Sequence, residues 1–396
     1  MRPSWPHSRR SLQADVTRPV CDTLAVIGPR GLLFGKNSDR PPDEPQVVER
    51  FAARPAGGTL RTQYLELPDP GAVAFVGSRP TWLWGVEHGV NEHGVAIGNE
   101  KLYTTGRPKD RPPALLGMDL VRLGLERGRT ADDAVEVMTG LIETHGQGGS
   151  GERDTDSPYD SSFLVADATT GWIVETCDRT WAARPIGAGA SVSNRISLGT
   201  DWTRASADVG SGTDFQQYRH PGVPTTIADH RLAATARCVA RGAAALSGDS
   251  IIAALRDHGT GPWGGPDSPT AVPPPVEAGP DRRGVTVCMH VVGLQNTTAS
   301  MVVEVSHGDP PEIRIRAALG NPCVSVFVPV AVDGPVPEVL GDEARWWRFA
   351  RLRDRVEADP AQIEEIRATL APVEDALAAG ATDPSAVDAA LTALGV

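Results

Sequence analysis

The sequence of 396 residues is poor in cysteine and in aromatic side chains, and it contains no long hydrophobic run. No stretch of about 18 apolar residues occurs, so we expect no transmembrane helix. The five cysteines are scattered along the chain and their number is odd, which excludes a disulfide framework. No two of them lie at a metal-ligand spacing, so the sequence predicts no metal site. We therefore expect a reducing, cytoplasmic setting.

Positive charge is also scarce, and lysine is the scarcer of the two cations. Only Lys36, Lys101 and Lys109 stand among 38 basic residues, against 50 acidic ones. The net charge of −12 and the isoelectric point of about 5.3 argue against a nucleic-acid or anionic-membrane partner. A hydrophobic content of 40% and a charged content of 22% are ordinary for a globular protein and exclude wholesale disorder.

The first twenty residues differ from the rest of the chain. Residues 1–20 are rich in Arg, Ser and Pro and have no periodicity, so we expect a disordered leader. Arg9 and Arg10 look like the start of a twin-arginine export signal, but polar residues follow where that signal needs an apolar stretch. Order is expected to begin at Cys21, and residues 21–396 are expected to form a single domain.

Strand-like segments are grouped in hairpins. Residues 21–28 and 32–35 alternate as strands and are joined by the turn sequence Pro-Arg-Gly. Paired helical segments separate the hairpins, which favours α+β layering over alternating βαβ units. Further strands are expected at residues 62–67, 72–78, 94–100, 162–168, 171–177, 189–194, 285–293, 299–305 and 323–330.

Helices and loops are indicated by spacing and by end signals. Thr130 precedes acidic residues and a helical pattern that stops at Gly146, as expected of a capped helix. Residues 146–160 read as a glycine-rich loop and a candidate lid. Residues 259–284 are rich in proline and glycine and read as a long loop inside the domain. Helices are expected at residues 113–128, 130–146, 227–246 and 249–258 and in the C-terminal part, 342–396.

The most informative motif is the first hairpin, because a cysteine opens it. The end of its second strand carries Lys36 and Asp39, and an antiparallel hairpin returns that end to the neighbourhood of Cys21. A reactive thiolate needs such a nearby cation or base. A lone cysteine on an apolar strand is more often a buried core residue, so spacing alone leaves both interpretations open.

Resemblance to a family favours a reactive Cys21 thiolate over a buried core cysteine. Residues 21–49, CDTLAVIGPRGLLFGKNSDRPPDEPQVVE, resemble the amino terminus of the secernins, within the C69 dipeptidase family. The resemblance implies an α+β fold, a four-layer αββα sandwich of the N-terminal nucleophile hydrolase type with C-terminal helices. It also implies a cysteine-dependent amide hydrolase, with a dipeptidase favoured and no cofactor. Further segments agree in family order, at residues 79–100, 191–202, 285–290, 321–329 and 343–352.

The resemblance assigns roles around the nucleophile. In this fold the catalytic cysteine is the first residue of the mature chain, which would be Cys21. Its freed α-amino group, with a pKa near ~7.7–8.0, can act as the general base for its own thiol. Asp39 would bind or orient that amino group, and Asn194 and Asn99 would stabilise the oxyanion.

Two positions depart from the pattern of related hydrolases. Lys36 stands where those enzymes have arginine, so the planar fork that binds a carboxylate with two hydrogen bonds is replaced by a point charge. The last catalytic arginine has no clear counterpart, and Arg282 or Arg283 is the candidate, with Arg283 preferred.

A free amino group at Cys21 requires that residues 1–20 be absent. Cys21 could attack the preceding peptide bond, so that the leader is a propeptide released by autocatalysis. Alternatively, the codon for Val20 could be a GTG start codon. The leader would then be a mis-assigned start, and the initiator methionine would be trimmed to expose Cys21.

Three functional classes remain open on the sequence. The first is a hydrolase of dipeptides or other small peptides, and the second an acylase for a non-peptide amide. The third is a non-enzymatic regulatory or binding protein of the secernin kind. A small peptide or amide is the expected partner, and a homo-oligomer is an open possibility.

Overall fold

The first sheet is built on the cysteine-opened hairpin. The computed structural model describes residues 21–223, 225–259, 284–381, 383 and 385–396. Within them, β1 (Asp22–Gly28) pairs antiparallel with β2 (Gly31–Arg40). The strand order is β12-β1-β2-β15-β16-β17, with β14 beside β15. The other strands of this sheet are β12 (Gly189–Val192), β14 (His290–Val291), β15 (Gln295–Val305), β16 (Ile313–Leu319) and β17 (Val328–Val330).

The second sheet is also antiparallel, in the order β13-β11-β10-β9-β8-β7-β6-β3. Most strands that are adjacent in this sheet are also consecutive along the chain, as the predicted hairpins require. The strands are β3 (Gln46–Phe51), β6 (Phe75–Pro80), β7 (His88–Asn91), β8 (Ala96–Leu102), β9 (Asp160–Ala166), β10 (Gly171–Cys177), β11 (Thr180–Pro185) and β13 (Arg204–Ala205). A separate small hairpin joins β4 (Thr59–Arg61) to β5 (Glu66–Pro68).

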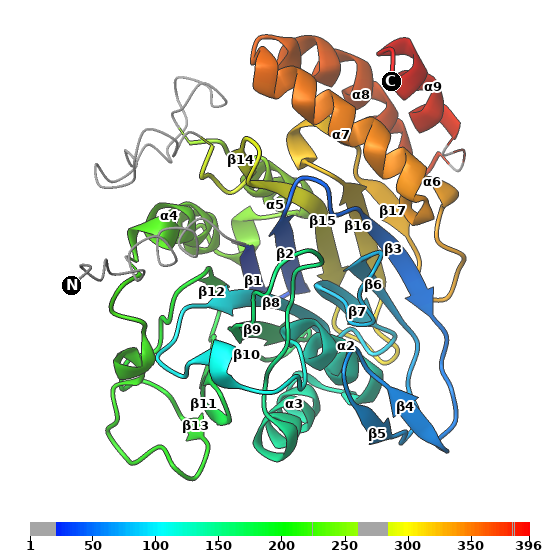
Figure 1. Ribbon diagram of the computed structural model, residues 1–396. Coiled ribbons are helices and arrows are strands. Elements are labelled where there is room, and N and C mark those ends of the chain that lie inside the picture. Colours follow the sequence, from blue (N-terminus) through cyan, green and yellow to red (C-terminus); the bar gives the residue numbers. More distant parts are fainter. Residues whose placement is uncertain (1–20, 224, 260–283, 382, 384) are drawn as a thin grey trace, which may run out of the picture.

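Helices cover the outer face of each sheet (Figure 1). The helices α2 (Gly117–Arg127) and α3 (Ala131–His145) pack on the second sheet, against β7, β8 and β10. The helices α4 (Thr226–Ala240) and α5 (Gly248–Leu255) pack on the first, against β1, β2 and β12. Alternation along the strands supplies both faces. On β1, Leu24 and Val26 pack toward the helices, and Ala25 packs toward the other sheet.

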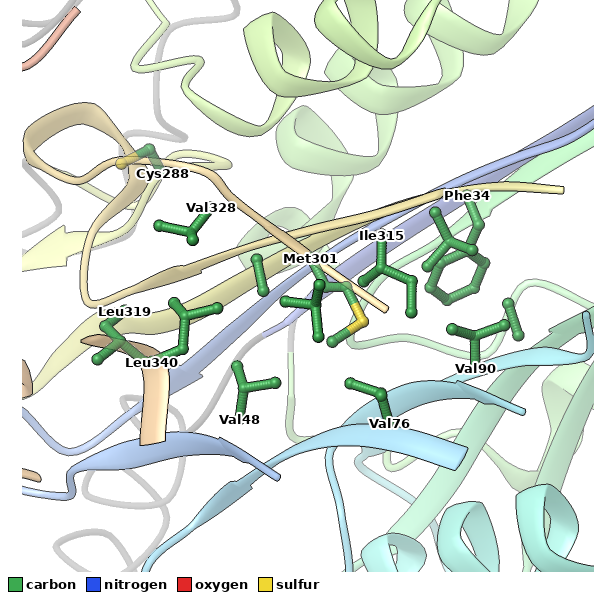
Figure 2. Close-up of a cluster of buried hydrophobic side chains, with 14 of the residues drawn as sticks. Phe34, Val48, Val76, Val90, Cys288, Met301, Ile315, Leu319, Val328 and Leu340 are labelled. Atoms are coloured by element: carbon green, nitrogen blue, oxygen red, sulfur yellow. The ribbon is translucent and has the colours of Figure 1, made fainter. Parts of the chain in front are cut away.

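The main core lies between the two sheets (Figure 2). Phe34, Met301 and Ile315 of the first sheet meet Val76 and Val90 of the second in one buried cluster. Burying both inner faces in this way removes a large apolar area from water and fixes how the sheets stack. The result is an α+β, four-layer αββα sandwich, so the predicted layering is confirmed.

The chain ends in helices at one side of the sandwich (Figure 1). Trp346 is fully buried and its indole N–H donates to the carbonyl of Thr298 in β15 at 2.8 Å, which anchors this part to the first sheet. The helices are α6 (Glu338–Gly341), α7 (Glu343–Ala358), α8 (Gln362–Ala378) and α9 (Ser385–Ala393). Across the described ranges, none of the helices combines the length and the apolar character that crossing a bilayer demands.

The local predictions fail in three places. The expected strand at residues 285–293 is reduced to β14, and the one at 323–330 begins with a short 3-10 helix, Pro322–Val324. The expected strand at 62–67 overlaps β5 only at Glu66 and Leu67, and residues 62–65 connect β4 to β5. The segments 285–293 and 323–330 are rich in apolar residues, and apolar content alone does not distinguish a strand from a packed irregular segment. The Pro/Gly-rich loop predicted at 259–284 lies outside the described residues except at Gly259 and Gly284.

Candidate active site

Cys21 lies directly before β1 and is buried where the hairpin ends meet. Its main-chain N–H donates to Oδ1 of Asn194 at 2.6 Å. Its sulfur accepts a hydrogen bond from the main-chain N–H of Asp39, with 3.4 Å between Sγ and N. The structure therefore brings together three residues expected at the site, Cys21, Asp39 and Asn194, from positions far apart in the sequence.

Asn194 is held in one orientation by contacts at both ends of its amide. Its Oδ1 accepts from Cys21 and from Nη2 of Arg231 at 3.0 Å. Its Nδ2 donates to the carbonyl of Lys101 at 3.0 Å. An amide nitrogen carries two hydrogens, so within the part of the chain that the structure describes one N–H of Asn194 remains for a further acceptor. That N–H is the group that could bind a developing oxyanion.

Arg231, on α4, is an arginine that the structure brings to Cys21. Its Nη1 donates to Oδ2 of Asp22 at 2.6 Å and to the carbonyl of Cys21 at 3.2 Å, and both charged side chains are fully buried. The sequence prediction placed this role at Arg282 or Arg283, which lie outside the described residues. Arg231 stands in an ordinary helical pattern with no motif around it. The one signal in the sequence is that this arginine stands at a position of the helix expected to face the sheet.

Asp39 is also buried, and its carboxylate is held on one side. Oδ1 accepts from the hydroxyl of Thr297 in β15 at 2.6 Å. Oδ2 is buried and has no hydrogen-bond partner among the described residues. Burial, together with the neighbouring Asp22, raises the pKa of Asp39 well above its usual range. A cationic or proton-donating group beside Oδ2 would relieve this strain on the carboxylate.

Lys36 is not a surface residue but lies between the two sheets. Its ammonium group is 3.8 Å from Oε1 of Glu100 on β8, and both side chains are fully buried. The close approach depends on Gly98, because a Cβ there would come within 2.5 Å of the Lys36 side chain. Burial alone would lower the pKa of Lys36, but the Cys21 thiol and the Glu100 carboxyl outweigh it and raise that pKa. Burial raises the pKa of Glu100 to about 7.

The thiol of Cys21 is neutral in this arrangement. Burial raises its pKa to about 12, and the nearby Lys36 only partly opposes that rise. At neutral pH the thiolate is therefore a small minority, and a base must take the proton before the sulfur can attack.

Asn99 lies on the other face of its strand. Its neighbours Gly98 and Glu100 face the first sheet, so Asn99 faces α2, as alternation along β8 requires. Its Nδ2 is 3.5 Å from the sulfur of Met118, and with the amide reversed it donates to Glu87. Among the described residues, the Asn99 side chain makes no hydrogen bond to Cys21 or Asn194, so its predicted role at the oxyanion stays a prediction.

A cavity of about 570 Å³ adjoins the Asn194 side of the site. Lys101, whose carbonyl holds Asn194, lines it, as does Tyr159, which is close enough to Cys21 to interact with it electrostatically. The predicted loop at 146–160 contributes Ser157, Pro158 and Tyr159 to the wall. Ser157 accepts a hydrogen bond from the Lys101 ammonium at 3.1 Å, so this part of the loop is packed onto the second sheet.

Comparisons with known proteins give a distant similarity. No protein-family model matches the chain. An N-acylethanolamine-hydrolyzing acid amidase ortholog from Caenorhabditis elegans is 12% identical over 72% of this chain and 92% of its own, with a TM-score of 0.38. Two variants of the conjugated bile acid hydrolase from Clostridium perfringens are each 11% identical over 80% of this chain and 95% of theirs, with TM-scores of 0.46 and 0.45. Similarity at this level carries no information about activity.

Proposed function

We propose that the protein is an amide hydrolase in which Cys21, once it is the first residue of the chain, is the nucleophile. The observation that carries the proposal is the 2.6 Å contact between the main-chain nitrogen of Cys21 and Oδ1 of Asn194. That contact holds the main-chain nitrogen of Cys21 in place. When this nitrogen becomes a free amine, Oδ1 of Asn194 is available to accept a hydrogen bond from it. Oδ2 of Asp39, buried and without a partner among the described residues, is the second group suited to bind that amine.

The chemistry follows from the neutral thiol. The free amine accepts the Sγ proton, and the resulting thiolate attacks the substrate carbonyl carbon. The second Nδ2 hydrogen of Asn194 binds the oxyanion that forms. The ammonium then returns the proton to the departing amine, which leaves an acyl group on sulfur. Water attacks this thioester with the amine again as base, and the acid product leaves.

The substrate class follows from the adjoining cavity. Lys101, Arg107 and Lys109 line it together with Asp110, which favours a substrate with a carboxylate. Its volume suits a molecule the size of a dipeptide rather than a long peptide. A dipeptide is therefore the first candidate. The apolar lining residues favour a second candidate, the acyl group of a non-peptide amide; they include Leu102, Tyr103, Pro108, Pro221 and Val223.

Intact mass measurement tests how Cys21 becomes the first residue. The full chain and its Cys21→Ala variant are expressed from Met1, and the intact mass of each is measured by mass spectrometry. Loss of residues 1–20 from the wild type alone is the result expected of self-cleavage. If both chains keep the leader, self-cleavage is wrong, and a gene that starts with Met directly before Cys21 supplies the protein for the assay.

The activity assay then compares dipeptides with N-acyl amides that lack a second amino acid. Hydrolysis of dipeptides alone supports a dipeptidase, and hydrolysis of the acyl amides alone supports an acylase. A chain with a verified N-terminal Cys21 that hydrolyses neither class and fails to be labelled at Cys21 by a mild thiol reagent would favour the non-enzymatic binding protein.

Asn194→Ala is expected to lower kcat by about 10²–10³-fold, because it removes the oxyanion donor. Loss of Oδ1 also frees the Cys21 amine, so a part of the effect will come from the base. Asn194→Asp keeps Oδ1, replaces the donor with a second acceptor oxygen and adds a negative charge that would repel the oxyanion. We therefore expect it to lose rate as well, and full activity in this variant would contradict the assigned role of the Nδ2 group.

A further inference from the structure

A second cluster of reactive side chains lies outside the catalytic set. His258, Cys288, His290 and Cys323 are all buried, and one nitrogen or sulfur from each lies within 4.8 Å of those from the other three. His258 follows α5, Cys288 lies just before β14, His290 is the first residue of β14, and Cys323 lies in the 3-10 helix Pro322–Val324. Figure 2 shows Cys288 at one end of the core between the sheets, beyond Val328. Nothing in the mechanism above uses them.

Two distances within the cluster are close to the ligand separations of a metal-binding tetrahedron. Nε2 of His290 is 3.2 Å from Sγ of Cys323 and 3.6 Å from Sγ of Cys288. Metal–ligand bonds of about 2.3 Å to sulfur and about 2.0–2.1 Å to nitrogen place such atoms about 3.6 Å apart in a tetrahedron. The rings of His258 and His290 are edge-on, with centroids 5.2 Å apart, so both can present a nitrogen to one point.

Groups around the cluster are arranged as in known metal sites. The other ring nitrogen of His290, Nδ1, is 3.2 Å from Oε1 of Glu357 on α7. That carboxylate is itself held by the side-chain amide of Asn296. A carboxylate that accepts the second N–H of a ligating histidine fixes its tautomer and strengthens it as a ligand.

We propose that His258, Cys288, His290 and Cys323 bind one structural zinc ion. Two thiolates and two imidazoles in tetrahedral positions are a donor set that zinc prefers, and four protein ligands leave no open position for catalysis. This proposal does not depend on the proposed function. It replaces the expectation of no metal site, which rested on spacing along the chain, since Cys288 and Cys323 are 35 positions apart in sequence.

The zinc site would stabilise the segment that backs the catalytic residues. Met289, between two of the ligands, donates its main-chain N–H to the hydroxyl of Thr297 at 2.9 Å. The same hydroxyl donates to Asp39 at 2.6 Å. The carbonyl of Val287, on the other side of Cys288, accepts from Asn37 of β2 at 2.7 Å. The ligand-bearing segment thus contacts β2 directly at Asn37 and is linked to Asp39 through the Thr297 hydroxyl.

Metal analysis of the full chain tests the proposal. The protein is produced with zinc in the medium, purified with a thiol reductant, dialysed and analysed by plasma mass spectrometry. We expect about one zinc ion per chain, and less than about a tenth of that in Cys323→Ser. Glu357→Gln keeps all four ligands and is expected to weaken zinc about 10–100-fold in competition with a chelator. Cys238→Ser, which removes another buried thiol, should keep its zinc.

A cobalt spectrum of the wild-type chain keeps the test decisive if Cys323→Ser fails to fold. Co²⁺ in place of zinc should give the intense visible bands of a tetrahedral site and a thiolate-to-cobalt charge-transfer band. Reduced wild-type protein that binds neither ion would overturn the proposal, as would a Cys288–Cys323 disulfide in place of the metal. Full zinc content in a folded Cys323→Ser variant would overturn it too.

Discussion

Cys21→Ala in the chain that begins at Cys21 is expected to reduce kcat for the amide substrate on the order of 10⁶-fold, as removal of a nucleophile does in a serine protease. Loss of the sulfur removes the covalent step, and the oxyanion donor and the substrate cavity alone cannot replace it. Cys21→Ser keeps a nucleophile but with a less acidic and less reactive atom, so it should retain only a small fraction of the rate. Steady-state kinetics at substrate saturation measure both effects.

Cys177→Ala is the matched control for that experiment. Cys177 ends β10, is buried like Cys21 and has a thiol pKa raised to about 11 by burial. Its replacement should leave kcat unchanged within about twofold. Removing a buried sulfur atom away from the reaction lowers the free energy of unfolding but not the catalytic rate. Equal rates for the Cys21→Ala and wild-type chains would exclude Cys21 as the nucleophile.

Arg231→Met is expected to lower the free energy of unfolding by about 3–5 kcal/mol, the range for breaking a buried ion pair by removing one partner. Asp22 would keep its charge or take up a proton in a site with no exposed surface. Asn194 would lose one of the donors that orient its amide. Urea denaturation followed by circular dichroism gives the change, provided that the variant is folded in the absence of denaturant.

Arg184→Met provides the comparison, because Arg184 pairs with Asp201 on the surface of the second sheet. Both side chains of that pair are about a third or more exposed, 34% and 49%. An exposed pair contributes about 0–1 kcal/mol. The two arginines should therefore differ severalfold in their effect on unfolding. Similar small losses for both would mean that the Asp22–Arg231 pair does not hold the site together.

Much of the fold could be predicted from local signals. The helix that begins after Thr130 starts and stops where expected, since the Thr130 hydroxyl accepts from the main-chain N–H of Asp133 at 3.1 Å and Gly146 ends it with a φ of 73°. The hairpin β1–β2 follows from alternation and a short turn. The strands β3 and β16 were not predicted. Their residues are mixed polar and apolar, and it is pairing with the neighbouring strands that makes these segments extended.

The candidate site was less accessible to sequence reasoning. A hairpin places Cys21 beside Asp39, because that contact is local in the strand pair. Arg231 could not be found, since it reaches Cys21 from a helix 210 positions away in sequence. The face on which Asn99 lies could not be fixed either, because one residue of register decides it. The approach of Cys288 to Cys323 depends on the same long-range packing.

The separation of the site residues along the chain also fixes when the site can exist. Cys21 contacts Asn194, which is 173 positions further on, and Asp39 is supported by Thr297, 258 positions further on. Contacts at such separations form late, after much of the chain entropy has been lost. A ribosome-bound chain that ends before β15 lacks the Thr297 hydroxyl. If Cys21 does release its own leader, that reaction must follow synthesis of most of the protein, so the mature amino terminus would mark only those molecules that have finished folding.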